Sequence, residues 1–252
     1  MKANPIVGQG TAPEAWQACP LLANLPFCEV DRLVPAGARA VIVAPHPDDE
    51  VLGCGGLLQH LLALGRPVQL ISVTDGTASH PGSQQWPVAR LAAERPRESA
   101  EALRRLGFEP GELPWLRVGL GDSQVPAGQG RLQAFLENHL LPSDVVFATW
   151  SQDGHCDHEA VGLASRAAAE AVGATVHELP IWTWHWATPG DPRVPWQRAR
   201  KVPLSAGMLA RKRHAAQAFT SQLQGDPEAG LAPVLSATVL ERLMQSYEVV
   251  LL

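Results

Sequence analysis

The 252-residue sequence lacks the features that mark membrane proteins and nucleic-acid-binding proteins. No apolar run approaches the ~20 residues that a helix needs to cross a bilayer. The N-terminal stretch, MKANPIVGQGTAPEAW, has no apolar core of the kind found in secretory signals. No run of basic residues is present, and 20 Lys and Arg against 25 Asp and Glu give a formal net charge of −5. We therefore expect a cytoplasmic chain with no transmembrane segment and no nucleic-acid partner.

Cysteine and tyrosine are also scarce. The four cysteines form no CxxC pair, so neither a disulfide framework nor a zinc ribbon is indicated, and free thiols are typical of a reducing compartment. Hydrophobic residues make up 46% of the chain and charged residues 18%, which excludes a disordered chain. Nine His and eight Trp against one Tyr are the unusual counts, and they hint at a binding site that composition alone does not locate.

Apolar periodicity predicts alternating strands and helices through the middle of the chain. Short apolar runs typical of buried strands lie at 40–44, 68–73, 116–118, 144–149 and 174–179. Helical spacing covers 48–64, 88–106, 132–141 and 160–171. This alternation predicts an α/β fold, Rossmann-like, with a mostly parallel sheet and helices on both faces.

The C-terminal part is less regular. A strand is predicted at 200–204 and helices at 206–223 and 233–245. The spacing of Trp182, Trp184 and Trp186 predicts an extended segment with three indoles on one face, which fits either core packing or stacking against a sugar. We expect this part to elaborate one domain rather than to form a second.

An acidic motif, His46-Pro-Asp-Asp-Glu50, follows the first predicted strand. Ligands bind at the carboxyl ends of strands in open α/β sheets. Three consecutive carboxylates repel one another, and a helix dipole worth ~0.3–1 kcal/mol for each charge explains only one or two of them. A divalent cation would relieve the repulsion, and His46 and Asp49 are close enough in sequence to bind one ion. An acidic first helical turn beside a histidine is the alternative that this motif alone leaves open.

A second polar motif, Asp153-Gly-His-Cys-Asp-His158, follows the fourth predicted strand. If the first and fourth strands are neighbours, the two motifs face each other across a crevice. His158 then supplies a third ligand, and catalytic zinc is held by three protein ligands with one open position. His155 remains as a general acid, with Asp153 or Asp157 available to orient its ring. Alternatively, Asp157 caps a helix and the histidines lie in a surface loop.

Together the two motifs resemble the LmbE-like, or PIG-L, family of zinc-dependent N-deacetylases. The resemblance rests on the acidic motif followed by Gly53-Cys-Gly-Gly56, and on His155-x-Asp-His158 downstream. Weaker similarities extend it over about 39–225: Thr74-Asp75-Gly76, Arg95-x-x-Glu98, Asp122, Lys212 and Ser221-Gln222. The chain departs from the family pattern at Ser123, where Gly is common, and at Cys156, where Pro is frequent. We expect one deacetylase domain over 39–252, preceded by an extension, 1–38, that packs on it.

The resemblance implies hydrolysis of the N-acetyl group of an N-acetylglucosamine-type sugar conjugate, so the expected partner is a small amino-sugar conjugate. It assigns the zinc ligands, for which Fe²⁺ is another candidate metal, to His46, Asp49 and His158. It also makes Asp48 the general base and His155 the general acid. Arg95 and Asp122 are the substrate contacts that the resemblance implies, and Trp184 is added as a stacking face; an exposed helical position is the alternative for Arg95. A homo-oligomer is compatible with all of this.

Two other functions fit parts of the pattern. Two His and one carboxylate bind ferrous iron in oxygenases, but an oxygenase does not need the neighbouring base Asp48. A non-catalytic, metal-stabilised sugar-binding domain is the second alternative. A structural zinc site would be closed by four ligands, so a base and an acid beside three ligands argue against it.

Overall fold

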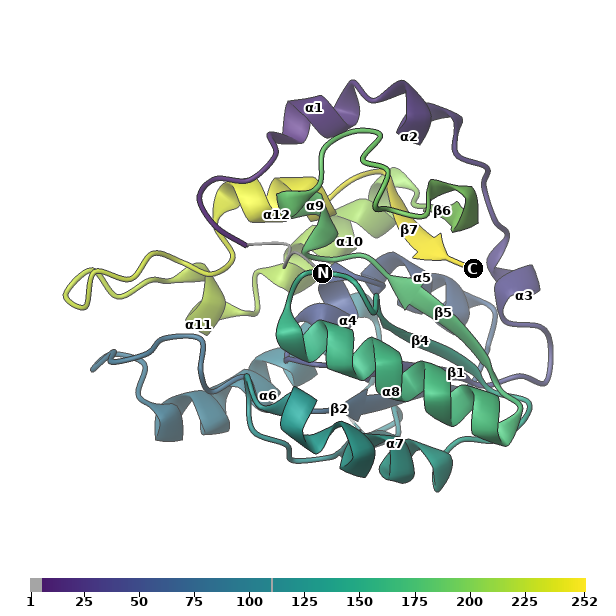
Figure 1. Cartoon of the computed structure of the whole chain (residues 1–252), viewed down its shortest axis with the longest axis horizontal. Helices are drawn as coiled ribbons and strands as arrows, with labels where there is room; N and C mark the ends of the chain where they lie inside the picture. Colours follow the sequence, from purple (N-terminus) through teal and green to yellow (C-terminus); the bar gives the residue numbers. More distant parts are fainter. Residues whose placement is uncertain (1–5, 110) are drawn as a thin grey trace.

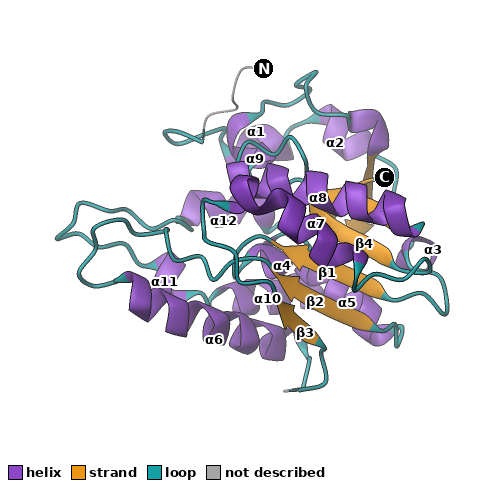
Figure 2. Ribbon diagram, turned by 60° about the horizontal axis from the view of Figure 1, so that its bottom comes forward, coloured by secondary structure: helices purple, strands orange, loops and turns teal. Residues whose placement is uncertain are grey.

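The computed structural model describes residues 6–109 and 111–252 and contains a seven-stranded sheet with helices on both faces (Figures 1 and 2). The strands are β1 (Ala40–Ala44), β2 (Val68–Ser72), β3 (Trp115–Arg117), β4 (Val145–Thr149), β5 (Thr175–Leu179), β6 (Ala199–Pro203) and β7 (Tyr247–Leu251). Their order is β3-β2-β1-β4-β5-β7-β6. The first five strands are parallel, and β7 runs antiparallel to β5 and β6. The predicted mostly parallel α/β sheet is confirmed.

The helices separate into layers around this sheet. The N-terminal helices are α1 (Pro13–Gln17), α2 (Pro20–Asn24) and α3 (Val30–Leu33). Those of the central part are α4 (Asp49–Leu52), α5 (Gly55–Ala63), α6 (Val88–Leu106), η1 (Val125–Gly128), α7 (Gln129–Glu137) and α8 (Cys156–Val172). The C-terminal ones are α9 (Thr183–Trp186), η2 (Trp196–Arg198), α10 (Ala206–Ala216), α11 (Thr220–Leu223) and α12 (Ala237–Leu243).

Alternate residues of the central strands build two apolar cores. On β1, Val41 and Val43 pack with Leu132, Leu136 and Val161 of α7 and α8. The other face of β1, through Ile42, belongs to the core that contains helix α5. Burial on both faces explains why β1 and β4 are almost entirely apolar.

The strand order reverses between β1 and β4. The chain leaves β1 toward β2 on one side, and β4 pairs with the opposite side of β1. Adjacent loops that follow parallel strands open a crevice at such a switch point. Both polar motifs begin at this edge, after Ala44 and Thr149, so the expectation that the first and fourth strands are neighbours is confirmed.

The predicted helix at 48–64 is instead two helices, α4 and α5. The residue that starts the second helix, Glu248, lies far away in the sequence. The Glu248 carboxylate of β7 accepts the backbone N–H groups of Gly56 and Leu57 at 2.6 and 2.8 Å, which caps a new helix start. Lys212 completes the contact, because its Nζ lies 2.6 Å from Glu248 and donates to the Leu52 carbonyl at the end of α4.

Three C-terminal predictions were wrong in detail. The tryptophan segment is not extended, since 183–186 form the one-turn helix α9, and its indoles do not share one strand face. The helix predicted at 206–223 is divided into α10 and α11, and the helix predicted at 233–245 is the shorter α12. Strand β7 follows α12 directly and was missed.

The N-terminal segment lies along the top of the molecule in Figure 1, beside α9 and α12. Trp16 of α1 is buried; its indole packs edge-on against Trp184 at 5.1 Å and donates to the Trp184 carbonyl. Leu22 and Leu33 extend the same core. No helix within residues 6–109 and 111–252 is long and apolar enough to span a membrane.

Candidate active site

The loop after β1 places three residues of the acidic motif in one buried turn. The His46 backbone N–H donates to Asp49 Oδ2 at 2.9 Å, and its ring Nδ1 lies 3.2 Å from the same oxygen. Asp48 adopts φ 140°, a conformation that L-residues rarely adopt and that costs about 1–3 kcal/mol. Its backbone N–H is held by Glu50 Oε2 at 3.0 Å. Strain of this kind is concentrated at functional sites.

The second motif opens helix α8 opposite this turn. His158 is fully buried, and its Nε2 faces Asp49 Oδ2 at 3.3 Å. Ligand nitrogens of His46, His155 and His158 all lie within 4.8 Å of one another. A second group with the same spacing joins His46 to Asp122 and Asp157. The turn after β1 and the start of α8 therefore converge on His46.

The cluster fits a cation. His158 Nε2 is buried without a hydrogen-bond partner, although it faces a carboxylate. Burial alone would lower the pKa of His158, but Asp49 and Asp153 raise it to about 9. The same environment attracts a divalent ion, because the carboxylates stabilise positive charge and Nε2 is available as a ligand. His46, His155 and His158 form a group whose three nitrogens could hold a metal ion, and Asp49 adds a carboxylate beside His46 and His158.

Asp153 lies against His158, whereas one of the sequence-based alternatives placed it against His155. Its Oδ2 is 2.8 Å from His158 Nδ1. A carboxylate on one ring nitrogen fixes the tautomer that leaves the other free for a metal. Asp157 instead faces His46, with Oδ2 3.1 Å from Nε2, and is held by the backbone N–H of Ser123 at 2.7 Å.

Arg95 is buried, so the exposed alternative for this side chain was wrong. Its guanidinium donates to Asp48 Oδ2 at 3.0 Å and to the carbonyls of Pro47 and Gly76 at 2.7 and 2.6 Å. Burial raises the pKa of Asp48, and Arg95 opposes this. The arginine thus aims the carboxylate and stabilises its charged form.

The ring Nε2 of His155 is the nitrogen that stays available to the site. The Asp157 backbone N–H donates to His155 Nδ1 at 3.2 Å, so Nδ1 is an acceptor and the neutral ring carries its proton on Nε2. Burial and the neighbouring His158 and His46 lower the pKa of His155 to about 4. A neutral ring with an Nε2–H group is suited to donate a hydrogen bond to an oxyanion.

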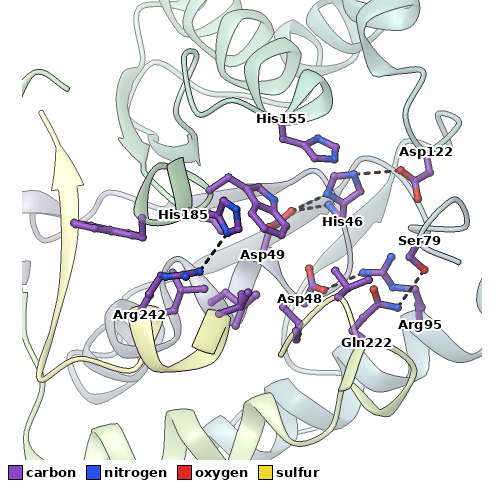
Figure 3. A pocket seen from close by; sticks show the side chains of 18 of the residues that line it. His46, Asp48, Asp49, Ser79, Arg95, Asp122, His155, His185, Gln222 and Arg242 are labelled. Carbon is purple, nitrogen blue, oxygen red and sulfur yellow. Dashed lines mark hydrogen bonds and ion pairs between the residues drawn. The ribbon is translucent and has the colours of Figure 1, made fainter. Parts of the chain in front are cut away.

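A pocket with about 850 Å³ of empty space, including its open mouth, extends from this cluster. Figure 3 shows Asp122, His46 and His155 on one side, Ser79, Arg95 and Gln222 below them, and His185 with Arg242 on the opposite side. Asp122 accepts the Ala78 backbone N–H at 2.7 Å and lies 3.4 Å from His46 Nε2.

The tryptophans differ in their relation to the pocket. Both Trp182 and Trp184 line it, but Trp184 is 8% exposed, donates to the Pro180 carbonyl and packs against Trp16 and Trp196. Trp182 is only partly buried. Arg242, which also lines the pocket, was not singled out from the sequence, because a lone arginine in a helix carries no local signal.

Comparison with known proteins decides the family. The model of the PIG-L family, described as GlcNAc-PI de-N-acetylase, matches residues 41–169, just over half of the chain. The chain belongs to the PIG-L family. Both motifs and the first four strands lie within the matched region, whereas α9 and α12 lie outside it.

Curated PIG-L relatives are deacetylases of amino-sugar compounds. A 1D-myo-inositol 2-acetamido-2-deoxy-alpha-D-glucopyranoside deacetylase of Mycobacteroides abscessus is 29% identical over 58% of this chain and 60% of its own length. The 2'-N-acetylparomamine deacetylase of Streptomyces fradiae is 31% identical over 52% of each chain. This chain therefore spans less than two thirds of the length of either relative.

Solved PIG-L-like structures share the fold. The N,N'-diacetylchitobiose deacetylase of Pyrococcus horikoshii superposes with a TM-score of 0.57 at 19% identity, covering 78% of this chain and 74% of that one. A zinc-inhibited form of the teicoplanin deacetylase Orf2 gives 0.58 at 18% identity, covering 73% and 85%.

Ser123, a departure from the PIG-L pattern, keeps the local backbone. Its φ is 63°, in the left-handed region that glycine favours. This conformation brings its N–H to Asp157. The substitution therefore leaves the positioning of Asp157 intact.

Proposed function

We propose that this chain is a metal-dependent hydrolase that removes the N-acetyl group from an N-acetylglucosamine-type sugar conjugate. The observation that carries the proposal is that His46 and Asp49 line one pocket with the separately held carboxylate Asp48, while His158 lies buried against Asp49. A pocket that only stored a metal would not need a strained, arginine-aimed carboxylate beside it. The named activities of the PIG-L relatives support the same reaction class.

His46, Asp49 and His158 would hold the metal, for which we propose zinc. The bound ion would supply an activated water and polarise the acyl oxygen. Asp48, aimed by Arg95, would accept a proton from the attacking water. His155 would donate its Nε2–H hydrogen bond to the developing oxyanion. Because a neutral His155 holds only that proton, the proton that Asp48 took from the water would pass to the leaving amine while the C–N bond breaks and acetate forms. Asp153 and Asp157 would orient the histidines.

Substrate contacts belong to this proposal as well. Asp122 would accept hydrogen bonds from sugar hydroxyls. Arg95 would act through Asp48 rather than by a long reach into the pocket, because both of its terminal nitrogens already donate to protein partners. Trp182 is a better stacking face than Trp184, because the latter is held in the core.

The decisive experiment is amine release from a panel of N-acetylated sugar conjugates, with and without a chelator. We expect release that the chelator abolishes and that stoichiometric metal restores. Zinc should be titrated separately from Fe²⁺, since a zinc-inhibited form is known for one fold neighbour. Asp48→Asn should lower kcat by ~10²–10⁴-fold while the bound metal remains. Full activity of this variant, or oxygen consumption with Fe²⁺ and no amine release, would contradict the proposal.

A further inference from the structure

One half of the pocket is built by segments outside the part of the chain that matches the family. These include α9, the 234–235 segment and α12, whose pocket-lining side chains include His185, Val239 and Arg242. Figure 3 places Arg242 and His185 on the side of the pocket opposite Asp122 and Ser79. This half lies away from the reacting group and is suited to the non-sugar part of a conjugate.

Arg242 is a buried cation without a negatively charged partner. It is 4% exposed. Its Nε donates to the Thr11 carbonyl at 2.6 Å, Nη2 donates to the Gln9 carbonyl, and Nη1 lies 3.2 Å from His185 Nδ1. Within residues 6–109 and 111–252, no carboxylate forms an ion pair with it. Residues 1–5 and 110 include no acidic side chain.

Burying the charged guanidinium of Arg242 without a negatively charged partner is unfavourable for folding. Burial lowers the pKa of Arg242, and no neighbouring acid offsets that effect. Buried charges are normally paired. Guanidinium carries five N–H donors, and the three contacts above leave two of them, one on each terminal nitrogen, for a ligand.

The surroundings strengthen attraction to an anion. Val234, Leu235, Val239 and Leu243 line the same half of the pocket. An apolar wall lowers the local dielectric, so a charge pair formed there gains more than it would in water. Guanidinium binds carboxylate and phosphate groups through two parallel hydrogen bonds. Hydroxyls of a neutral sugar would not require a buried charge.

We infer that this half of the pocket binds an anionic group, carboxylate or phosphate, on the non-sugar part of the conjugate. The inference rests on the proposed function and narrows its substrate class to anionic glycosides of N-acetylglucosamine with an apolar linker. The linker would lie against Val239 and Leu243, and the anion would pair with Arg242. Gln9 and Thr11 hold the guanidinium in place through their carbonyls.

The test compares the phenyl, 4-carboxyphenyl and 4-phosphophenyl glycosides of N-acetylglucosamine. For the wild-type chain we expect kcat/KM to be about tenfold or more higher for the charged glycosides, equivalent to about 1.4 kcal/mol. Arg242→Gln should bring the ratio of charged to neutral rates close to one. Arg213→Gln is the matched control, because Arg213 is an exposed arginine that also donates to a backbone carbonyl and does not line the pocket. The charged glycoside with the larger increase in kcat/KM over the phenyl glycoside shows whether the site prefers carboxylate or phosphate.

A second pair of variants covers the case in which Arg242→Gln fails to fold. Val239→Glu places a carboxylate in this half of the pocket and should remove the preference for charged glycosides, whereas Val239→Gln should keep it. If Arg242→Gln slows all three glycosides equally, or if the wild-type chain shows no preference, the anion site is refuted while the deacetylase proposal stands.

If no glycoside is hydrolysed, a binding measurement tests the anion site separately from the deacetylase proposal. Calorimetry with the metal-loaded chain then measures affinity for the same three glycosides. Tighter binding of the charged glycosides, lost in Arg242→Gln, supports the anion site although the deacetylase proposal has failed. Equal affinities for the three glycosides would refute the anion site.

Discussion

Asp153 serves two parts of the site with one buried carboxylate. Its Oδ2 faces His158, and its two oxygens accept the backbone N–H groups of Ile181, Trp182 and Thr183 at 2.9–3.0 Å. The first contact fixes which nitrogen of His158 is free for a metal. The others start the helical turn α9 and so place Trp182 at the pocket. A single side chain therefore couples the geometry of the metal cluster to that of the aromatic wall.

Replacing this carboxylate should weaken metal binding. We expect Asp153→Asn to lower the metal affinity by about 10–100-fold, the usual cost of losing a carboxylate behind a ligand histidine. Competition with a chromophoric chelator measures the effect. Asp75→Asn is a suitable control, because Asp75 forms a more exposed pair with Arg117 away from the cluster. Unchanged metal affinity in a folded Asp153→Asn chain would remove Asp153 from this role.

Helix α9 joins the N-terminal segment to the pocket. Trp184 faces inward against Trp16 and Trp196, while Trp182 faces the pocket and is partly buried. The two tryptophans are two residues apart but have different surroundings. This division allows core packing and substrate contact to be measured separately.

Alanine at these two positions should give opposite results. Trp184→Ala should lower the free energy of unfolding by about 3–5 kcal/mol, as large core truncations do. Trp182→Ala should leave stability nearly unchanged and raise KM for the sugar conjugate. Denaturant unfolding and steady-state kinetics on both variants test the division. A raised KM for Trp184→Ala at full stability would assign the stacking face to Trp184 instead.

The sequence predicted those elements whose signal is local. Helix α6 coincides with the predicted 88–106, and the central strands lie where β-branched apolar runs occur. Both motifs were placed at the correct sheet edge because their strands could be recognised. Helices that depend on a distant carboxylate were not predictable in this way. Asp153 starts α9 from 28–30 residues away, and Glu248 caps α5 from 191–192 residues away.

The contacts of the site residues were likewise predictable only where the signal is local in the sequence. The two motifs were sufficient to predict that His46, Asp49 and His158 lie together, because the first and fourth strands are neighbours in the sheet. The partner of Asp153 was not predictable from spacing, since His155 is nearer in sequence but the carboxylate contacts His158. Arg242 could be found only in three dimensions, where two N-terminal carbonyls and His185 surround it.

At the scale of the whole molecule, two different parts of the chain build the pocket. The part that matches the PIG-L family supplies the histidine and aspartate cluster around His46, together with Asp48. The N-terminal segment and the C-terminal elements supply the wall around Arg242. Variation in these outer segments can change the accepted substrate without altering the reacting groups.

Metal should stabilise the whole fold, because its donors come from two separate loops of the sheet. Binding to the folded chain alone contributes about 2.7 kcal/mol at a free metal concentration 100 times Kd. For a chain of this size the melting temperature should rise by about 5–10 °C on loading. Calorimetric melting of chelated and reloaded protein measures this shift. His158→Ala should abolish it, and identical melting temperatures for apo and loaded wild-type chain would argue against a metal at this cluster.

The cap that Glu248 provides for α5 has a consequence for biosynthesis. The acidic motif emerges early from the ribosome, but the carboxylate that caps the following helix is encoded 192 residues later than Gly56. Helix α5 therefore cannot take its final capped form until translation has passed β7. The acidic motif would accordingly leave the ribosome ahead of a helix whose start is still uncapped.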